Sequence, residues 1–533
     1  MTIKKYLLQN WQGNLFAAVC VILRSLSEVL AGFASANAIT KLVSHNLPGF
    51  GKWLLIQIIL LLIFCLGIFA ELYFGKKAMQ RMDTMIRTDI ASNISQLSYS
   101  DFHRKNPADF ESWLTNDIQI INQQGFQNLL DIISGVSGFI FAISGLMYYH
   151  YSLVILTLIL TVIMTILPKL FNKAIEQKSL AQSKALERSM NLFTDAINGF
   201  DDLLLLNLEK RIVKKIHQGS KDIELYANKY NQVDGCMTAT INAYSTFCQI
   251  AIIGLTGILY LAKLVPVGSI MATQTCAGSV FAGITGITIS YIDYKAINPL
   301  FKKFNTIKVK DAHNNKIVVS SFKHDIQIKN LSFHYLEGSD ILKDINFTIE
   351  KNKKYAIIGP SGSGKTTLSK LLTGSITSYR GQILFDGIDL QKIAPEALRN
   401  LMVIISQNPF IFNGTIKENI LLGRFFSDKR LTQVIEQAGL SEFIAALPNG
   451  IDTVISKSGN NLSGGQKQRI AMARGMISGA NIIIMDEGTS ALDKKKARKI
   501  EKNLVSNPSL TVLMITHHLS DSTRSKLDGI LQI

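Results

Sequence analysis

Residues 359–366 constrain the fold of this chain more than any other segment. They read Gly-Pro-Ser-Gly-Ser-Gly-Lys-Thr, follow the apolar run Lys354-Tyr-Ala-Ile-Ile358 and precede the run Thr367-Leu-Ser-Lys-Leu-Leu372. A glycine-rich loop between a strand and a helix lets backbone N–H groups converge on phosphate, and the helix N-terminus adds positive potential. The segment therefore predicts a strand–loop–helix unit that binds the phosphates of a nucleotide.

The side chains of this loop have separate expected roles. Lys365 is expected to contact the β- and γ-phosphates, and the Thr366 hydroxyl to ligate Mg²⁺. A chance glycine turn would not be expected to combine the strand before the loop with the helix after it, so ATP and Mg²⁺ are the expected cofactors. The predicted phosphate-binding set comprises Gly359, Pro360, Ser361, Gly362, Ser363, Gly364, Lys365, Thr366 and Thr367.

A second run supplies carboxylates for the same chemistry. Residues 481–485 are almost wholly apolar, as in a buried parallel strand, and Asp486 and Glu487 follow them directly. Asp486 is expected to reach the Mg²⁺ shell. Glu487 is expected to be the general base for the attacking water, because phosphoryl transfer depends on positioning more than on covalent chemistry. A helix-capping pair is the alternative interpretation, and the phosphate loop argues against it.

A third run, Leu462-Ser-Gly-Gly-Gln466, has the form of a helix start. Ser463 suits an N-cap, Gly464 and Gly465 permit close backbone approach, and Gln466 opens the helix that follows. Placed between a phosphate loop and a carboxylate run, these residues resemble the signature motif of ATP-binding cassette (ABC) proteins. The resemblance implies that two cassettes pack head to tail, so that each signature serine binds the nucleotide held by the other phosphate loop.

Other residues match positions of the same family. Tyr335 resembles the aromatic residue that stacks on adenine, and Gln407 the glutamine that reaches Mg²⁺ and senses the membrane domain. His517 matches the histidine at the γ-phosphate, and residues 490–493 are similar to the family's D-loop. The resemblance implies a catalytic set of Glu487, His517 and Gln407, and a metal-binding set of Thr366, Gln407 and Asp486.

The first 290 residues carry about six apolar stretches that are long enough to cross a bilayer, which takes about 20 residues each. Lysine and arginine flank these stretches, so the net charge of +17 is interpreted as a positive-inside bias rather than as nucleic-acid binding. No cleavable signal peptide is evident in residues 1–10, and a multi-pass protein of the cytoplasmic membrane is expected. The stretches lie near 15–43, 53–75, 127–149, 151–171, 240–262 and 267–290.

The connections between the stretches alternate between short and long. The two long connections are polar, and an up-and-back helical hairpin of about 50 residues would project some 35–40 Å. The N-terminus, both long arms and everything after about residue 290 are therefore expected in the cytosol. Residues 99–117 and 195–209 resemble the two cytoplasmic coupling loops of ABC exporters.

Together these patterns predict an all-α transmembrane domain of about six helices with long cytoplasmic extensions, followed by an α/β P-loop ATPase domain. The expected boundaries are 1–310 for the transmembrane domain, 311–325 for a linker and 326–533 for the nucleotide-binding domain. The resemblance implies a half-sized ABC exporter that works with a second half-transporter, as a homodimer or a heterodimer. ATP would drive export, or leaflet-to-leaflet translocation, of a substrate that the sequence does not identify.

Three other classes share parts of this pattern. An ATP-gated channel or membrane regulator would have the same architecture, and ion current without uphill transport would identify it. A soluble ABC ATPase that acts on nucleic acid or ribosomes conflicts with the apolar stretches, so no nucleic-acid partner is expected. An importer conflicts with the presence of the membrane and ATPase parts on one chain.

Several positions depart from the exporter pattern or stand out within the apolar stretches. Lys457 stands where a glutamate is usual before the signature, His518 replaces an arginine, and the end at Ile533 implies a shortened final strand and tail. Arg24 and Glu28 lie one turn apart in the first stretch, where charges tend to face a cavity or each other. We expect these two side chains to form an ion pair, with a contact between Arg24 and an anionic head group as the alternative. The five cysteines are expected to be apolar packing residues.

Overall fold

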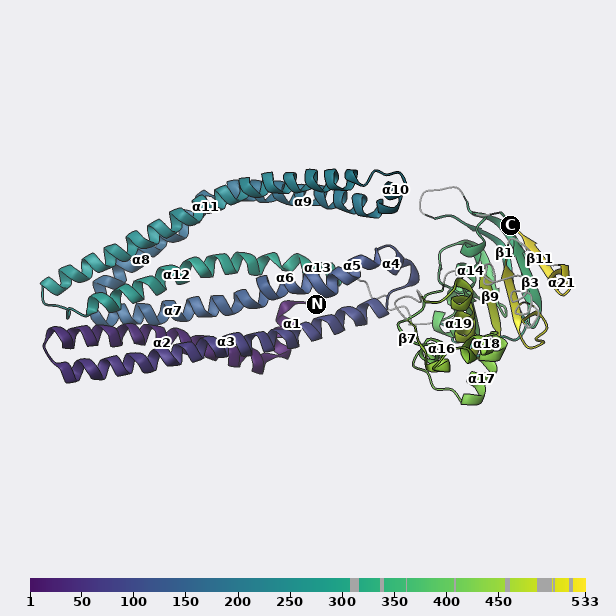
Figure 1. Cartoon of the computed structure of the whole chain (residues 1–533), viewed down its shortest axis with the longest axis horizontal. Coiled ribbons are helices and arrows are strands. Elements are labelled where there is room, and N and C mark those ends of the chain that lie inside the picture. Colours follow the sequence, from purple (N-terminus) through teal and green to yellow (C-terminus); the bar gives the residue numbers. More distant parts are fainter. Residues whose placement is uncertain are drawn as a thin grey trace. The chain divides into compact units, whose positions relative to one another are not determined.

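Two separate units, one helical and one of mixed strands and helices, make up the chain in the computed structural model (Figure 1). The structure describes residues 1–306, 316–335, 340–360, 362–406, 409–455, 461–486, 501, 504–516 and 521–533. Unit 1 comprises Met1–Ser95 and Asn106–Lys308, and unit 2 comprises Gln96–Lys105 and Val309–Ile533. The predicted order, a helical membrane region followed by an α/β ATPase region, is confirmed.

Long helices dominate unit 1. Within the described residues, six helical runs are long and apolar enough to cross a membrane: Trp11–Val43, Leu47–Ser95, Pro107–Tyr149, Tyr151–Leu170, Lys210–Leu261 and Ser269–Asn305. They confirm the six predicted stretches. The helices α3 (Leu47–Ser95) and α11 (Lys210–Leu261) have 49 and 52 residues. At 1.5 Å per residue each reaches over 70 Å, well beyond the roughly 30 Å hydrocarbon core, as the predicted cytoplasmic extensions require.

The remaining helices of unit 1 complete the bundle and its extensions. α2 packs along α3, α7 along α12, and α9 along α11. All five cysteines are free, and three of them, Cys20, Cys248 and Cys276, are buried. The helices are α1 (Ile3–Gln9), α2 (Trp11–Val43), α5 (Pro107–Ser112), η1 (Trp113–Asp117), α6 (Ile118–Ile120), η2 (Ile121–Gln127), α7 (Asn128–Tyr149), α8 (Tyr151–Ile166), η3 (Leu167–Leu170), α9 (Asn172–Asn198), α10 (Phe200–Leu205), α12 (Ser269–Ala296) and α13 (Asn298–Asn305).

The helices α9, α10 and α11 form a hairpin whose tip, at α10, stands apart from the other helices of unit 1 (Figure 1). The hairpin is fixed internally, since Ser189 Oγ donates to Gly219 O at 2.9 Å. Leu186, Met190 and Ile197 lie on one face of α9 and are 49%, 54% and 62% exposed. Apolar side chains repeated on one helix face normally pack against another element. This face of α9 is therefore a surface that unit 1 leaves uncovered.

A cluster of aromatic side chains fixes α13 to the rest of unit 1. Tyr6 is fully buried, its hydroxyl donates to Asp89 Oδ2 at 2.9 Å, and its ring stacks on Phe301 with 6.2 Å between the centroids. Trp113 of η1 is fully buried against Phe304. The last described helix of unit 1 is therefore held from both sides, by α1 and by η1.

Arg24 pairs with Glu71 of α3, so the predicted pairing with Glu28 is wrong. Arg24 Nη1 lies 2.9 Å from Glu71 Oε2, and Arg24 Nη2 donates to Ser134 Oγ of α7 at 2.6 Å. A Cβ atom added to Gly67 would lie 3.0 Å from Arg24 Cβ, so the absence of a side chain there gives the arginine room. Spacing along one helix could not show this pair, because its two members come from different helices. Glu28 is exposed.

Unit 2 contains a parallel and an antiparallel sheet. The five-stranded sheet has the order β11-β3-β10-β9-β6 with every neighbouring pair parallel, and the four-stranded sheet has the order β2-β1-β4-β5 with antiparallel pairs. The strands are β1 (Asp325–Phe333), β2 (Leu342–Glu350), β3 (Lys354–Ile358), β4 (Arg380–Phe385), β5 (Ile388–Asp389), β6 (Met402–Ile405), β7 (Gly414–Thr415), β8 (Val454–Ile455), β9 (Ile482–Asp486), β10 (Thr511–Ile515) and β11 (Gly529–Gln532).

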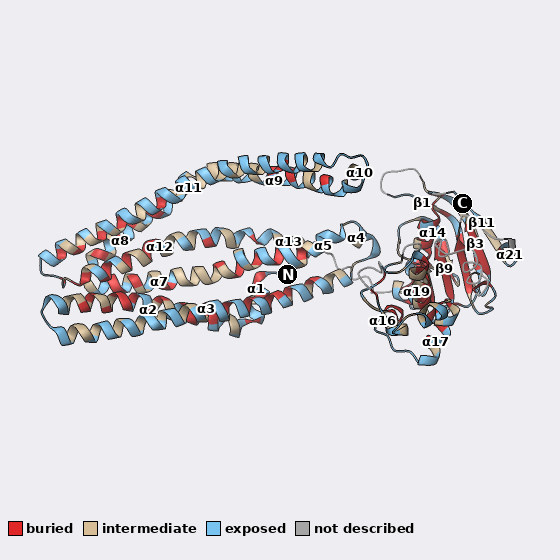
Figure 2. Cartoon of the chain, in the orientation of Figure 1, coloured by how far each residue is buried: buried red, intermediate tan, exposed pale blue. Residues whose placement is uncertain are grey.

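The parallel sheet is buried on both faces, as Figure 2 shows along its strands. In β9, Ile482 and Ile484 face the core shared with the antiparallel sheet, whereas Ile483 and Met485 face the core shared with the helices. This burial explains why the strand reads as a continuous apolar run. The helices are α4 (Tyr99–His103), α14 (Lys365–Leu372), η4 (Leu390–Lys392), α15 (Pro395–Leu401), α16 (Ile416–Leu421), α17 (Asp428–Gln437), α18 (Ser441–Ala445), η5 (Gly450–Asp452), α19 (Gly464–Ile477) and α21 (Asp521–Arg524).

Replacement of Glu71 by Gln is expected to destabilise unit 1 by about 3 kcal/mol, because Arg24 then keeps a partly buried charge without its counter-charge. Thermal unfolding of the full-length protein in detergent measures the effect. Glu28→Gln changes an exposed carboxylate on the same helix as Arg24 and is the matched control, with no change expected. Equal unfolding midpoints for the two variants would contradict the pairing of Arg24 with Glu71.

Candidate nucleotide-binding site

Two of the predicted site segments lie at the carboxyl ends of parallel strands. β3 ends at Ile358 before the glycine loop, and β9 ends at Asp486. Because neighbouring strands of this sheet are all parallel, these ends share one edge, where open α/β sheets bind their ligands. Several residues that the sequence analysis singled out lie outside the described residues: Ser361, Gln407, Lys457, Glu487, residues 490–493, His517 and His518.

The glycine loop has a backbone conformation that suits glycine. Gly362 and Gly364 have φ angles of 85° and 93°, in the left-handed region. A Cβ atom added to Gly364 would lie 2.7 Å from Leu342 Cδ2. α14 begins at Lys365, directly after this glycine, so the unpaired N–H groups of its first turn follow the loop. The backbone therefore has the form of an anion-binding helix start.

Two polar side chains of the loop fit a bound phosphate chain. Lys365 is 5% exposed, and its Nζ donates to Gly359 O at 2.9 Å and to Pro360 O at 2.7 Å. Ser363 Oγ is buried and has no hydrogen-bond partner among the described residues. A buried hydroxyl without a partner carries a desolvation cost. A phosphate oxygen in the loop would offset that cost, so this orphaned atom supports nucleotide binding at the loop.

Two oxygen-bearing side chains fit a magnesium ion. Thr366 is exposed on the first turn of α14, and Asp486, 9% exposed, ends β9. Mg²⁺ takes oxygen ligands, usually one or two from the protein together with waters and substrate phosphates. The described residues hold no group of three or more His, Cys, Asp or Glu that could bind a metal without such help. The donor set therefore fits Mg²⁺ that is bound together with a nucleotide.

Tyr335 lies next to α14, the helix that follows the glycine loop. It follows β1, its ring meets that of Phe333 edge to face at 4.9 Å, and its hydroxyl is 3.4 Å from Thr367 Oγ1 of α14. Thr367 is buried, whereas Tyr335 is 48% exposed. An aromatic ring that is fixed at its edge and open to solvent can stack on a nucleotide base.

The signature run starts α19, as predicted. Ser463 Oγ accepts from Gln466 N at 3.3 Å, and Ser463 N donates to Gln466 Oε1 at 2.7 Å, so the pair forms a capping box. Gly465 is buried, whereas Ser463 and Gly464 are exposed. The first turn of α19 therefore presents backbone N–H groups at a surface, where they can bind an anion.

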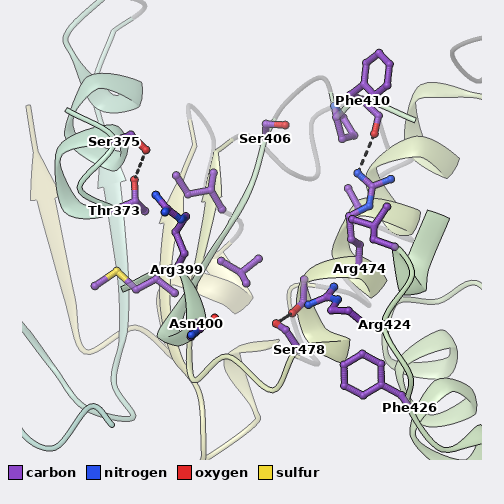
Figure 3. A pocket seen from close by; sticks show the side chains of 17 residues that line it. Thr373, Ser375, Arg399, Asn400, Ser406, Phe410, Arg424, Phe426, Arg474 and Ser478 are labelled. Atoms are coloured by element: carbon purple, nitrogen blue, oxygen red, sulfur yellow. Dashed lines mark hydrogen bonds between the residues drawn. The ribbon is translucent and has the colours of Figure 1, made fainter. Parts of the chain in front are cut away.

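A groove of about 700 Å³ lies between β6, α15 and α19 (Figure 3). Three arginines, Arg399, Arg424 and Arg474, and two aromatic residues, Phe410 and Phe426, are among its lining residues. Arg474 Nη1 donates to Phe410 O at 2.9 Å across one wall. No sequence motif indicates this basic groove, because its residues come from separate segments.

A helical unit with six candidate spans, joined to a P-loop ATPase unit, defines a membrane-bound protein that uses a nucleotide. Comparison with known families agrees. The family described as the ABC transporter transmembrane region matches residues 15–284, and the family described as ABC transporter matches residues 342–490. The chain belongs to the ABC transporter family, with the membrane region fused to the ATP-binding cassette.

Individual relatives extend this result. The ATP-dependent lipid A-core flippase of Desulfotalea psychrophila is 28% identical over 456 residues, covering 81% of this chain and 77% of the relative. The uncharacterized ABC transporter ATP-binding protein YfiC of Bacillus subtilis is 26% identical over 542 residues, covering 98% and 87%. A solved structure of a bacterial Atm1-family ABC exporter with ATP bound has a TM-score of 0.77 at 21% identity, covering 98% of this chain and 93% of that chain. The chain is therefore an ATP-hydrolysing, multi-pass membrane transporter with an exporter fold.

Replacement of Gly364 by Ala is expected to raise the Kd for ATP more than about tenfold, because a Cβ atom meets Leu342 and a positive φ strains any other residue. Equilibrium binding of a fluorescent ATP analogue measures the loss. Gly387→Ala is the matched control, since Gly387 has a φ of 81° but nothing within 4 Å of an added Cβ atom. Unchanged ATP affinity in the Gly364 variant would contradict the described loop.

Proposed function

We propose that two such chains form an ATP-driven exporter in which each nucleotide lies between the phosphate loop of one chain and the signature helix of the other. The observation that carries this proposal is the exposed start of α19. Ser463 and Gly464 are exposed although the capping box is complete, so the first turn of α19 is open to a ligand from outside the chain. The second chain is either an identical copy or a different half-transporter, and the subunit composition of the purified protein distinguishes the two.

Each site would combine residues of both chains in separate roles. Residues 359–367 would bind the phosphates, and Tyr335 would stack on the adenine. Residues 463–466 of the other chain would contact the γ-phosphate. Thr366, Gln407 and Asp486 would hold Mg²⁺, which neutralises charge on the phosphates when bound. Glu487 would orient and deprotonate the attacking water, with His517 at the γ-phosphate.

The uncovered face of α9 supports pairing of two chains. Leu186, Met190 and Ile197 are exposed on a hairpin that extends past the apolar stretches, so lipid tails would not cover them. A second chain that packs on this face would remove their apolar surface from water. The proposed dimer therefore uses the arm as well as the cassettes.

We place the ATPase unit and both arms in the cytosol, with 1–310 as transmembrane domain, 311–325 as linker and 326–533 as nucleotide-binding domain. Residues 96–105, which include the start of the predicted first coupling loop at Tyr99, belong to unit 2. There Lys370 Nζ of α14, the proposed phosphate-binding helix, lies 5.5 Å from the centre of the Tyr99 ring. This contact within unit 2 supports a mechanical link between the first loop and the phosphate-binding helix.

The tip of the second arm has the opposite character to the groove in Figure 3. In α10, Asp201 and Asp202 are exposed, and Leu204 and Leu205 are 46% and 81% exposed. An acidic and apolar helix complements a groove lined by arginines and phenylalanines. We therefore propose that the α10 tip of the second chain occupies this groove in the dimer, so that cassette closure moves the membrane helices.

An apolar groove in unit 1 favours a substrate with an apolar chain. This groove, about 590 Å³ in volume, lies between α2, α3 and α7, and Phe33, Trp53, Phe141 and Tyr148 contribute to its lining. It is formed by helices long and apolar enough to cross a membrane, which gives an amphipathic molecule access from the bilayer. The names of the flippase relatives point to the same class. We therefore propose translocation of a lipid-like amphiphile, tested by ATP-dependent movement of fluorescent lipids between the leaflets of proteoliposomes.

Replacement of Glu487 by Gln is expected to abolish ATP turnover while ATP-dependent pairing of cassettes persists, since the neutral amide cannot take a proton from water. Phosphate release and cross-linking of the full-length protein in lipid measure the two effects. Lys365→Ala is the contrasting variant and should lose both. Normal turnover in the Glu487 variant would remove the assigned base.

Reversal of the acidic charges of α10, with Asp201→Arg and Asp202→Arg together, is expected to lower the amount of lipid moved per ATP hydrolysed, because like charges would then face the groove. Glu224→Arg reverses an exposed charge on the same hairpin and should leave this ratio unchanged. An unchanged ratio in the α10 variant would exclude the tip as the coupling element. Ion current without lipid movement in the wild-type protein would instead indicate a channel.

A further inference from the structure

Arg474 of α19 is a partly buried arginine that the proposed nucleotide chemistry does not use. Its Nε donates to Asn419 O at 2.8 Å, and its Nη2 donates to Asn419 Oδ1 at 3.1 Å. Its Nη1 donates to Phe410 O at 2.9 Å, the bond drawn in Figure 3. The guanidinium also lies 5.4 Å from the centre of the Phe412 ring. One side chain of the signature helix thus contacts two other segments of the unit.

The partners of Arg474 are uncharged. The ion pairs among the described residues involve other side chains. Burial lowers the pKa of the Arg474 guanidinium, and the nearby Arg424 lowers it further, although arginine stays charged in proteins. A charge in this setting is tolerated only when its hydrogen bonds are well formed. The planar fork of arginine is suited to hold several oxygen atoms in fixed positions.

Asn419 completes the attachment from the other side. This residue is fully buried, its Nδ2 donates to Phe412 O at 2.8 Å, and its Oδ1 accepts from Phe412 N at 2.8 Å. Residues 410–412, which we call the strap, are therefore fixed by Arg474 at one end and by Asn419 at the other. In the sequence the strap begins three residues after Gln407.

We infer that Arg474 is a positioning residue that ties the signature helix to the strap, so that the start of α19 and the segment after Gln407 move together. The inference rests on the proposed function, in which Gln407 acts at the nucleotide of its own chain and Ser463 at that of the other chain. Arg474 lies about three turns along α19 from Ser463, and its side chain bonds to Asn419 and Phe410, so it acts on the proposed nucleotide sites through other residues. Its role is to coordinate the two nucleotide sites to which one chain contributes.

The test is Arg474→Lys in the full-length protein in lipid. A lysine keeps the charge but cannot hold three acceptors in a plane. We expect kcat for ATP to fall at least about tenfold while KM changes less than about twofold, the pattern of lost alignment rather than lost nucleotide binding. The thermal midpoint should stay within about 2 °C of wild type, which separates positioning from stability. A wild-type kcat in this variant would overturn the inference. A lower kcat together with a higher KM and a lower thermal midpoint would also overturn it.

Arg430→Lys is the matched control. Arg430 of α17 donates to Met476 O of the same helix α19 at 2.7 Å, and its side-chain bonds do not involve the strap. We expect this variant to keep the wild-type kcat, and an equal loss of kcat in both variants would show that any arginine bonded to α19 suffices. Both arginine variants keep Glu487, so their kcat values test the role of Arg474. Normal turnover in Glu487→Gln would contradict the proposed function and would leave the comparison of the two arginine variants unaffected.

A double variant tests whether Arg474 acts through the strap. Asn419→Ala removes the other attachment of the strap, so the combination with Arg474→Lys should lower kcat no further than the more damaging single variant. Losses that multiply would overturn the assignment to the strap. If Asn419→Ala does not fold, the comparison of Arg474→Lys with Arg430→Lys decides.

Discussion

Parallel pairing of β3, β10, β9 and β6 is the constraint on which the nucleotide site depends. It brings the carboxyl ends of four strands to one edge, so residues distant in sequence are delivered to one region. The glycine loop follows one of these ends and Asp486 another. Burial of the sheet on both faces fixes the register of its strands. A shift by one residue would turn the side chains of each core toward the other core. The position of the loop therefore depends on the buried apolar side chains of the sheet.

Long helices give the membrane half a different kind of rigidity. In a bilayer each backbone polar group needs an internal partner, and a helix provides one along its whole length. Helices such as α3 and α11 can therefore continue from the apolar stretch into the extensions without a break. The pair between Arg24 and Glu71 ties α2 to α3 inside this region. Such links would let a movement at one end of a helix reach the other end.

Much of this organisation could be predicted from the sequence, because it depends on local patterns. Continuous apolar runs indicated β9 and the spans, and the glycine loop indicated the turn into α14. The helix start at Ser463 was also indicated by its residue type, whereas the capping box with Gln466 became evident only in the structure. Contacts between distant segments were not predictable in this way. Glu71 was missed as the partner of Arg24 because the two residues lie on different helices. Arg474 and Asn419 were missed because most of their bonds run to backbone atoms, which leave no residue-specific signal.

The hydrogen bonds from Lys365 to the carbonyl groups of Gly359 and Pro360 have a consequence for the affinity of the loop for ATP. If Lys365 binds phosphate as proposed, the phosphate chain would compete with these carbonyls for one ammonium group, and the exchange of partners would reduce the net gain in free energy. After product release, the same carbonyls could accept hydrogen bonds from the ammonium group again. The charge of Lys365 would then keep its partners throughout the cycle, which suits the loop to repeated binding and release.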